Sequence, residues 1–187
     1  HPITSRRIAE SRDQSVSYPA VKNPDTTDFY HAQAKIHVLS GSNAADTVLQ
    51  FKSTLESGRY ENKNAERYGY ALALLANKQY AEARSTIQDL LAQHPDYALY
   101  RIAQAEIEMA AGNDTTALKL YAAAVRNKPD DYALNQRYAT ALLKTEHSPE
   151  AKKLLRTMVR QWPQEPALQK MFAVAAGNSG SLLEAHQ

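Results

Sequence analysis

Residues 83–95 read ARSTIQDLLAQHP, and the pattern returns as ALKLYAAAVRNKP at 117–129 and AKKLLRTMVRQWP at 151–163. Each copy begins with alanine, keeps apolar residues at fixed positions and closes on proline, and the interval between successive copies is constant. The alanine of the series appears once more, at Ala185. A period of about 34 residues is typical of helix–turn–helix repeats, in which each unit buries its apolar face against its neighbours.

The residues around these copies define two helices in each unit. The closing prolines lack a backbone N–H, so we expect each to end a second helix. Ser148-Pro149-Glu150 has the features of a helix start, with a capping residue, a first-turn proline and an acidic residue. In the second unit, DYAL at 96–99 recurs at 131–134, a shift one residue longer than the period. We therefore expect the first helix of the second unit to begin one residue earlier than the period requires, and the turn around Gly112 to contain one extra residue.

Composition narrows the class of protein. Alanine makes up 31 of the 187 residues, and few segments alternate with period two, so we predict an all-α fold of closely packed helices. The absence of cysteine excludes disulfides and thiolate chemistry. The net charge of +2 comes from scattered basic residues, which argues against a nucleic-acid binder. No apolar run is long enough to span a membrane.

The spacing and the small and apolar positions resemble the tetratricopeptide repeat (TPR). The consensus Trp and Gly are missing, with Arg67 or Asn135 and an alanine in their places. The resemblance implies a right-handed superhelix of stacked antiparallel helix pairs, an α-solenoid. We expect the array to cover residues 29–187, as about four helix pairs plus a truncated last unit. Residues 28–39 and 43–55 would form a degenerate first hairpin, and the last helix, from Ser181, would be cut short, as in a fragment of a longer protein.

The order of segments before the array carries a second resemblance. His1-Pro2 and Arg7 precede a linker with two prolines, and Asp28-Phe29-Tyr30 opens the array. This order resembles bacterial periplasmic zinc metalloproteases that assist outer-membrane β-barrel assembly. The resemblance implies that residues 1–28 are a junction segment and linker after a missing N-terminal protease domain, which would hold the zinc. It also implies a periplasmic location.

The chain itself offers no residues for catalysis. The HExxH motif of zinc proteases is absent, so we predict no catalytic, cofactor-binding or metal-binding residues and no peptide hydrolysis by this chain. His31 and His37 are six residues apart, on opposite sides of a helix, and are expected to be ordinary surface or interface residues. Glu106 and Glu108 diverge on a helix and are expected to be solvated.

Protein–protein interaction is therefore the predicted function. The first helices of a TPR stack form its concave surface, which accepts a partner segment. The TPR pattern places seven residues in this groove: Tyr68, Leu72, Arg101, Glu108, Gln136, Thr140 and Lys170. The partner would be a protein or peptide, and the protease resemblance suggests outer-membrane β-barrel proteins or their assembly machinery. Two alternatives stay open: a free-standing TPR scaffold, and an intramolecular structural cover of the protease domain.

Overall fold

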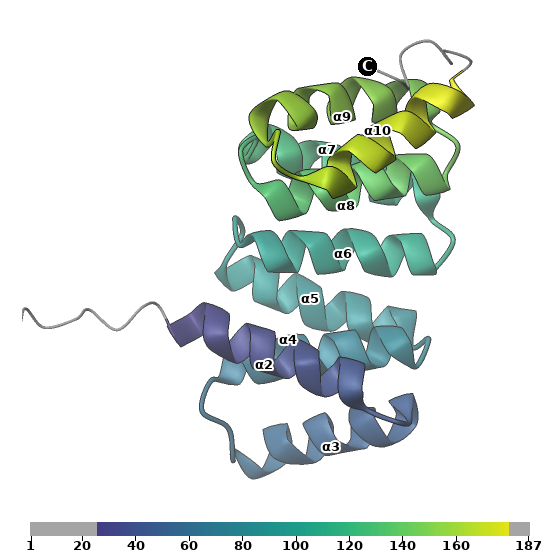
Figure 1. Ribbon diagram of the computed structural model, residues 1–187. Helices are drawn as coiled ribbons and strands as arrows, with labels where there is room; N and C mark the ends of the chain where they lie inside the picture. Colours follow the sequence, from purple (N-terminus) through teal and green to yellow (C-terminus); the bar gives the residue numbers. More distant parts are fainter. Residues whose placement is uncertain (1–25, 180–187) are drawn as a thin grey trace, which may run out of the picture.

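The structure is a computed structural model that describes residues 26–179. The described residues form helices and no strand, which confirms the all-α prediction (Figure 1). The helices are α2 (Thr26–Ser40), α3 (Ala44–Ser57), α4 (Lys63–Ala76), α5 (Tyr80–Gln93), α6 (Ala98–Ala110), α7 (Asp114–Asn127), α8 (Tyr132–Lys144), α9 (Ser148–Gln161) and α10 (Pro166–Asn178). Most of the predicted junction 1–28 and the predicted helix from Ser181 lie outside the described residues. None of the described helices is long and apolar enough to cross a membrane.

The repeat period is visible in the helix boundaries. From α4 to α9, every first helix is joined to its second helix by a turn of three residues, 77–79, 111–113 and 145–147. The middle residue of each turn is left-handed: φ is 61° at Lys78, 80° at Gly112 and 62° at Glu146. The predicted extra residue in the second turn is therefore wrong. Helix α6 does not begin early either, because its first residue lies one full period before the first residue of α8.

The repeated alanines lie at the closest helix contacts. Ala83, Ala117 and Ala151 are completely buried, because each second helix meets the preceding first helix at this small side chain. The apolar position four residues later is buried in every unit, as Ile87 and Leu155 illustrate. The predicted stripe of small and apolar residues is thus confirmed as the core of the stack.

The first two helices depart from the regular stack. Both were predicted, but α2 and α3 pack far more extensively on α4 than on each other, so they do not form the expected hairpin. Helix α2 begins at Thr26, inside the predicted junction, and crosses over α4 on the face that also displays α6, α8 and α10 (Figure 1). Gly69 of α4 makes this arrangement possible: a Cβ atom there would overlap the Phe51 ring of α3 and crowd Ala34 of α2.

Candidate protein-binding groove

The face that carries the predicted groove residues is built from the first helix of each unit. Helices α4, α6, α8 and α10 contact one another in succession, and α2 covers part of α4 at one end of this row (Figure 1). Between α2 and the row lies a cavity of about 260 Å³, which we call the α2 pocket. Its lining residues are Lys35, Val38 and Leu39 of α2, Leu72, Leu75 and Ala76 of α4, Glu106 of α6 and Arg137 of α8.

A buried histidine fastens α2 in place. His31 has no exposed surface, and its Nδ1 lies 2.7 Å from the carbonyl oxygen of Thr27. Since a carbonyl only accepts, Nδ1 donates, and in the neutral ring Nε2 accepts from the Tyr100 hydroxyl of α6, 2.8 Å away. The rings of Tyr68, Tyr97 and Tyr100 surround the imidazole at centroid distances of 5.3, 5.1 and 5.4 Å.

This environment keeps the imidazole neutral. Burial lowers the pKa of His31, and the charge of His94 lowers it further, whereas the Thr27 hydrogen bond and the charge of Asp28 raise it. Burial also raises the pKa of the Tyr100 hydroxyl to about 12, so this hydroxyl stays protonated and able to donate. At neutral pH the two rings therefore form one fixed hydrogen bond between α2 and α6.

The polar end of the α2 pocket is a loose ion pair. Nη1 of Arg137 lies 3.5 Å from Oε1 of Glu106, and the two side chains retain 46% and 28% of their exposure. Burial raises the pKa of Glu106, and the charges of Arg137 and Lys35 offset part of this rise. Glu106 was expected to be solvated, but its side chain is half-buried beside Arg137 of α8 and Lys35 of α2.

Glu108 has a different and structural role. Its carboxylate accepts from Nε and Nη2 of Arg84 on α5, at 2.5 and 2.9 Å, and from Nδ2 of Asn113, at 2.8 Å. The Arg84 hydrogen bonds are the main cause of the lowered pKa of Glu108. Glu108 is buried, so the prediction that it is solvated is also wrong, and it connects α6 with α5 instead of lining the α2 pocket.

The other predicted groove residues fall into three groups. Leu72 is a wall of the α2 pocket. Tyr68 is covered by His31, and Arg101 donates from Nε to the carbonyl of Pro95 at 2.7 Å, in a narrow cleft beside α7. Gln136, Thr140 and Lys170 keep accessible side chains on α8 and α10. Gln136, Thr140 and Lys170 therefore stay accessible to a partner, whereas Leu72 borders the α2 pocket with only 8% of its surface exposed.

Most residues of the α2 pocket escaped the sequence analysis. Glu106 could have been found, because it lies one repeat period after Leu72 and one before Thr140. Neither Arg101 nor Glu108 lies one repeat period after a groove residue of α4. The α2 residues follow no repeat, so no sequence signal placed Lys35, Val38 and Leu39 beside α4.

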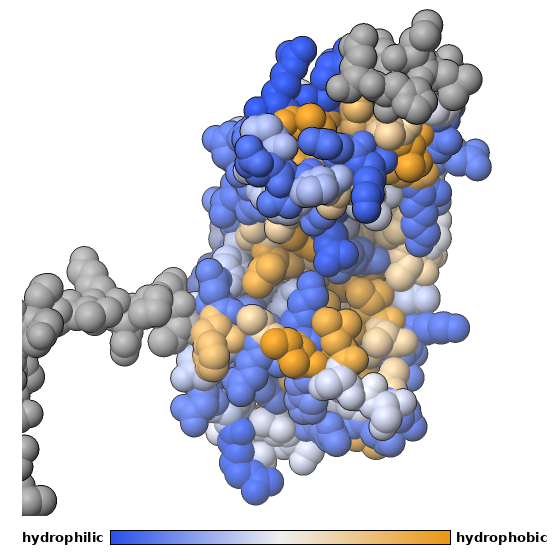
Figure 2. Space-filling view, viewed as in Figure 1, coloured by the Kyte–Doolittle hydropathy of each residue, from blue (hydrophilic) through white to orange (hydrophobic). Residues whose placement is uncertain are grey.

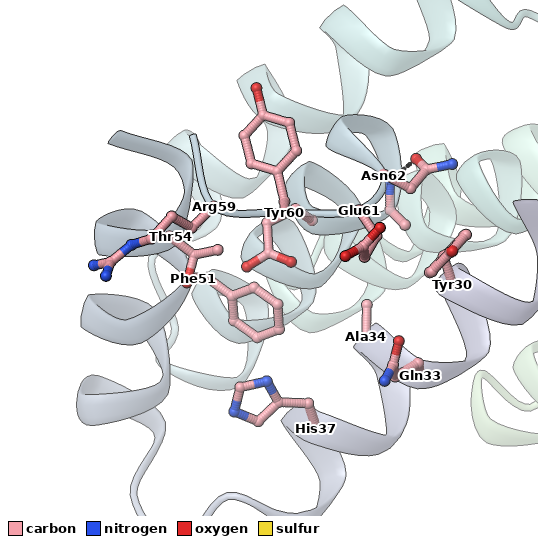
Figure 3. A pocket seen from close by; sticks show the side chains of 12 residues that line it. Tyr30, Gln33, Ala34, His37, Phe51, Thr54, Arg59, Tyr60, Glu61 and Asn62 are labelled. Atoms are coloured by element: carbon pink, nitrogen blue, oxygen red, sulfur yellow. Dashed lines mark hydrogen bonds between the residues drawn. The ribbon is translucent and has the colours of Figure 1, made fainter. Parts of the chain in front are cut away.

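A second cavity separates α2 from α3. It measures about 380 Å³, and Figure 3 shows the Phe51 ring inside it, near His37. His37 connects the two helices, with Nε2 3.1 Å from Oε1 of Gln50 and its ring centroid 4.9 Å from that of Phe51. The walls of this second cavity carry both acidic and basic groups, among them Glu61, Glu66 and Arg59. Within residues 26–179, no group of three or more His, Cys, Asp or Glu side chains is placed to hold a metal ion.

Two family models agree with this geometry. Both are described as tetratricopeptide repeat, and they match residues 68–132 and 108–174, together more than half of the chain. The chain belongs to the tetratricopeptide repeat family. Solved structures share the fold: MamA from Desulfovibrio magneticus superposes with a TM-score of 0.61 at 15% identity, covering 87% of this chain and 90% of MamA. A TPR protein from Parabacteroides merdae gives 0.61 at 14% identity, over 89% and 64% of the two chains.

Curated relatives support the second resemblance. The TPR chain is 23% identical over 180 residues to the β-barrel assembly-enhancing protease of Yersinia pestis, a match that covers 96% of this chain and 37% of that protein. It is 26% identical over 118 residues to the protease of the same name from Escherichia coli K12, covering 63% of this chain and 24% of the relative. The chain therefore spans well under half the length of the curated relatives that it matches.

Proposed function

We propose that this TPR array is a protein-interaction module that holds a segment of a partner polypeptide on its concave face. The α2 pocket carries the proposal, because it combines apolar walls from α2 and α4 with charged groups from α6 and α8. Gln136, Thr140 and Lys170 extend the accessible surface along α8 and α10. Concave surfaces of stacked helix pairs are general binding sites for extended or helical segments.

The similarity to β-barrel assembly-enhancing proteases suggests the setting of this module. We propose that the array belongs to a longer periplasmic zinc metalloprotease and that its partners are outer-membrane β-barrel proteins or their assembly machinery. In this proposal, zinc and the hydrolytic step belong to a protease domain outside this chain. The array would contribute binding and positioning of polypeptide.

Site-specific photocrosslinking in the full-length parent protein tests this function. A photoreactive residue is introduced at Leu39, Thr140 or Lys170 on the concave face, and at Leu49 of α3 or Lys153 of α9 as exposed controls. We expect crosslinks to separate polypeptides from the concave positions and not from the controls. Equal crosslinking from both sets of positions would contradict the proposal.

One observation favours an intramolecular cover as the second candidate. Phe29, Ile36 and Leu39 of α2 are 64%, 64% and 75% exposed, so α2 presents a row of apolar side chains to the outside. Such a row is costly in water and suits a packed interface. Crosslinks from Leu39 to the protease domain alone would favour this role. The sequence preceding His1 distinguishes a free-standing scaffold from the two metalloprotease roles, the interaction module and the intramolecular cover. Only the metalloprotease roles require an HExxH domain there.

A further inference from the structure

The apolar half of the α2 pocket is open to a side chain from outside. Val38 and Leu39 of α2 face Leu72 and Leu75 of α4 across the cavity, and Leu39 keeps 75% of its surface exposed. On the face shown in Figure 2, hydrophobic surface runs along α2 and continues beside it towards α6. A cavity of roughly 150 Å³ accepts a benzene ring, so the volume of about 260 Å³ admits a large aliphatic or aromatic side chain.

The charged half of the pocket is basic. Lys35 makes no hydrogen bond or ion pair with any residue in the range 26–179, and Arg137 meets Glu106 only through the long 3.5 Å contact. A guanidinium has five N–H donors, so most of those on Arg137 remain available to a ligand. Glu106 is the only acidic residue among those that line this pocket, and burial disfavours its ionised form.

One further cation lies on this face beyond the pocket. Lys170 of α10 is exposed on the face formed by the first helices. Glu108, which the repeat pattern had placed in the groove, is instead bonded to Arg84 on α5 and does not reduce this charge. The pocket therefore holds two cations, Lys35 and Arg137, against one partly buried carboxylate, and Lys170 adds a third cation on α10.

We propose that the α2 pocket selects a partner segment in which a large apolar residue is followed or preceded closely by Asp or Glu. The apolar side chain enters between Leu39 and Leu72, and the carboxylate reaches Arg137 and Lys35. This inference rests on the proposed interaction function and specifies its ligand: an acidic, apolar stretch of polypeptide. A planar guanidinium binds a carboxylate through paired hydrogen bonds, which fixes the orientation of the segment.

Selection from a phage-displayed library of random dodecapeptides tests the proposal with the whole 187-residue chain as bait. The most enriched peptide is then synthesised with a fluorescent label, and its Kd is measured by anisotropy. Three variants alter the pocket at accessible side chains, Leu39→Ser, Lys35→Glu and Arg137→Glu. Leu49→Ser on α3 and Arg160→Glu on α9 are matched controls, because both side chains are exposed and neither lines the pocket. Circular dichroism verifies that every variant is folded.

We expect the enriched peptides to carry Leu, Ile or Phe within two positions of Asp or Glu. Leu39→Ser and Arg137→Glu should each raise the Kd roughly tenfold or more, Lys35→Glu should raise it less, and the controls should change it less than about twofold. Binding should weaken with added salt for the wild-type chain and much less for Arg137→Glu.

Two results would overturn the inference while leaving an interaction function in place. One is enrichment of basic or uncharged peptides, and the other is enrichment of acidic peptides whose affinity is unaffected by the three pocket variants. Enrichment of no peptide above a bait-free control would count against both the inference and the proposed groove. The proposed function and its ligand can therefore fail separately.

Discussion

Replacing Tyr100 by phenylalanine tests how α2 is held against the first helices of the stack. The substitution keeps a ring that is only 1% exposed and removes the hydroxyl that donates to Nε2 of His31. His31 is fully buried, so its ring nitrogen would lose this partner where water cannot easily replace it. Leaving a buried acceptor unpaired costs about 1–3 kcal/mol, which is the expected loss in the free energy of unfolding of Tyr100→Phe.

Urea unfolding at pH 8, followed by far-UV circular dichroism, measures this loss. Tyr121→Phe is the control, since Tyr121 is 3% exposed and its hydroxyl makes no hydrogen bond with residues 26–179. We expect this control to change the free energy of unfolding by less than about 0.5 kcal/mol. If the two variants lose the same amount, the His31–Tyr100 hydrogen bond does not hold α2 and the reasoning is refuted.

Three further predictions concern titration, turns and an ion pair. The folded pKa of His31 is below its unfolded value of about 6.5, so its contribution to stability is complete above that pH and is lost as pH falls. In urea titrations from pH 8 to 5, the free energy of unfolding should decline less steeply for His31→Gln than for the wild-type chain. Equal declines would contradict this. Gly112→Ala should destabilise the fold by about 1 kcal/mol and Lys78→Gly should stabilise it by a similar amount, because both positions have positive φ. A Cβ at 112 meets no atom within 4 Å, so the cost there is backbone strain alone. Thermal melts of the two variants should show melting temperatures that change in opposite directions. Arg84→Ala should lower the free energy of unfolding by about 1–2 kcal/mol, because it leaves the Glu108 carboxylate without its cation. The loss is smaller than for breaking a fully buried ion pair, since a third of Arg84 is exposed. An unchanged urea midpoint would argue against this prediction.

The regular part of the fold could be predicted because one period fixes several independent positions. The alanines and prolines repeat together, and the apolar residues between them fall on one helix face. This agreement predicted the second helices α5, α7 and α9, whose closing prolines follow Gln93, Asn127 and Gln161 within two residues. Repetition of a whole packing unit is a stronger signal than the propensity of any single segment.

The error in the second unit shows where sequence similarity misleads. The two DYAL tetrapeptides are separated by one residue more than the period, but they span a loop and a helix start, where one residue can shift without changing the packing. The helix register is set by the three-residue turns and their left-handed middle positions. Lysine and glutamate occupy two of these positions, Lys78 and Glu146, where glycine would have marked the turn.

The placement of α2 was beyond prediction from a single sequence. Its helical character was expected, but its position depends on contacts between residues far apart in the chain, such as His31 and Tyr100, which are 69 positions apart. The absence of a side chain at Gly69 also matters, since it lets α2 and α3 both approach α4. No repeat period relates these residues, so nothing in the local pattern identifies them as partners.

One wall of the α2 pocket is thus supplied by a helix that is itself docked through a titratable ring. A peptide that binds only when α2 is in place favours the unprotonated imidazole of His31. Because the two equilibria share one thermodynamic cycle, protonation of His31 lowers the affinity for the peptide by the same factor by which bound peptide lowers the affinity of His31 for a proton. Affinity in mildly acidic buffer then reports on the attachment of α2, and bound peptide in turn makes α2 harder to detach.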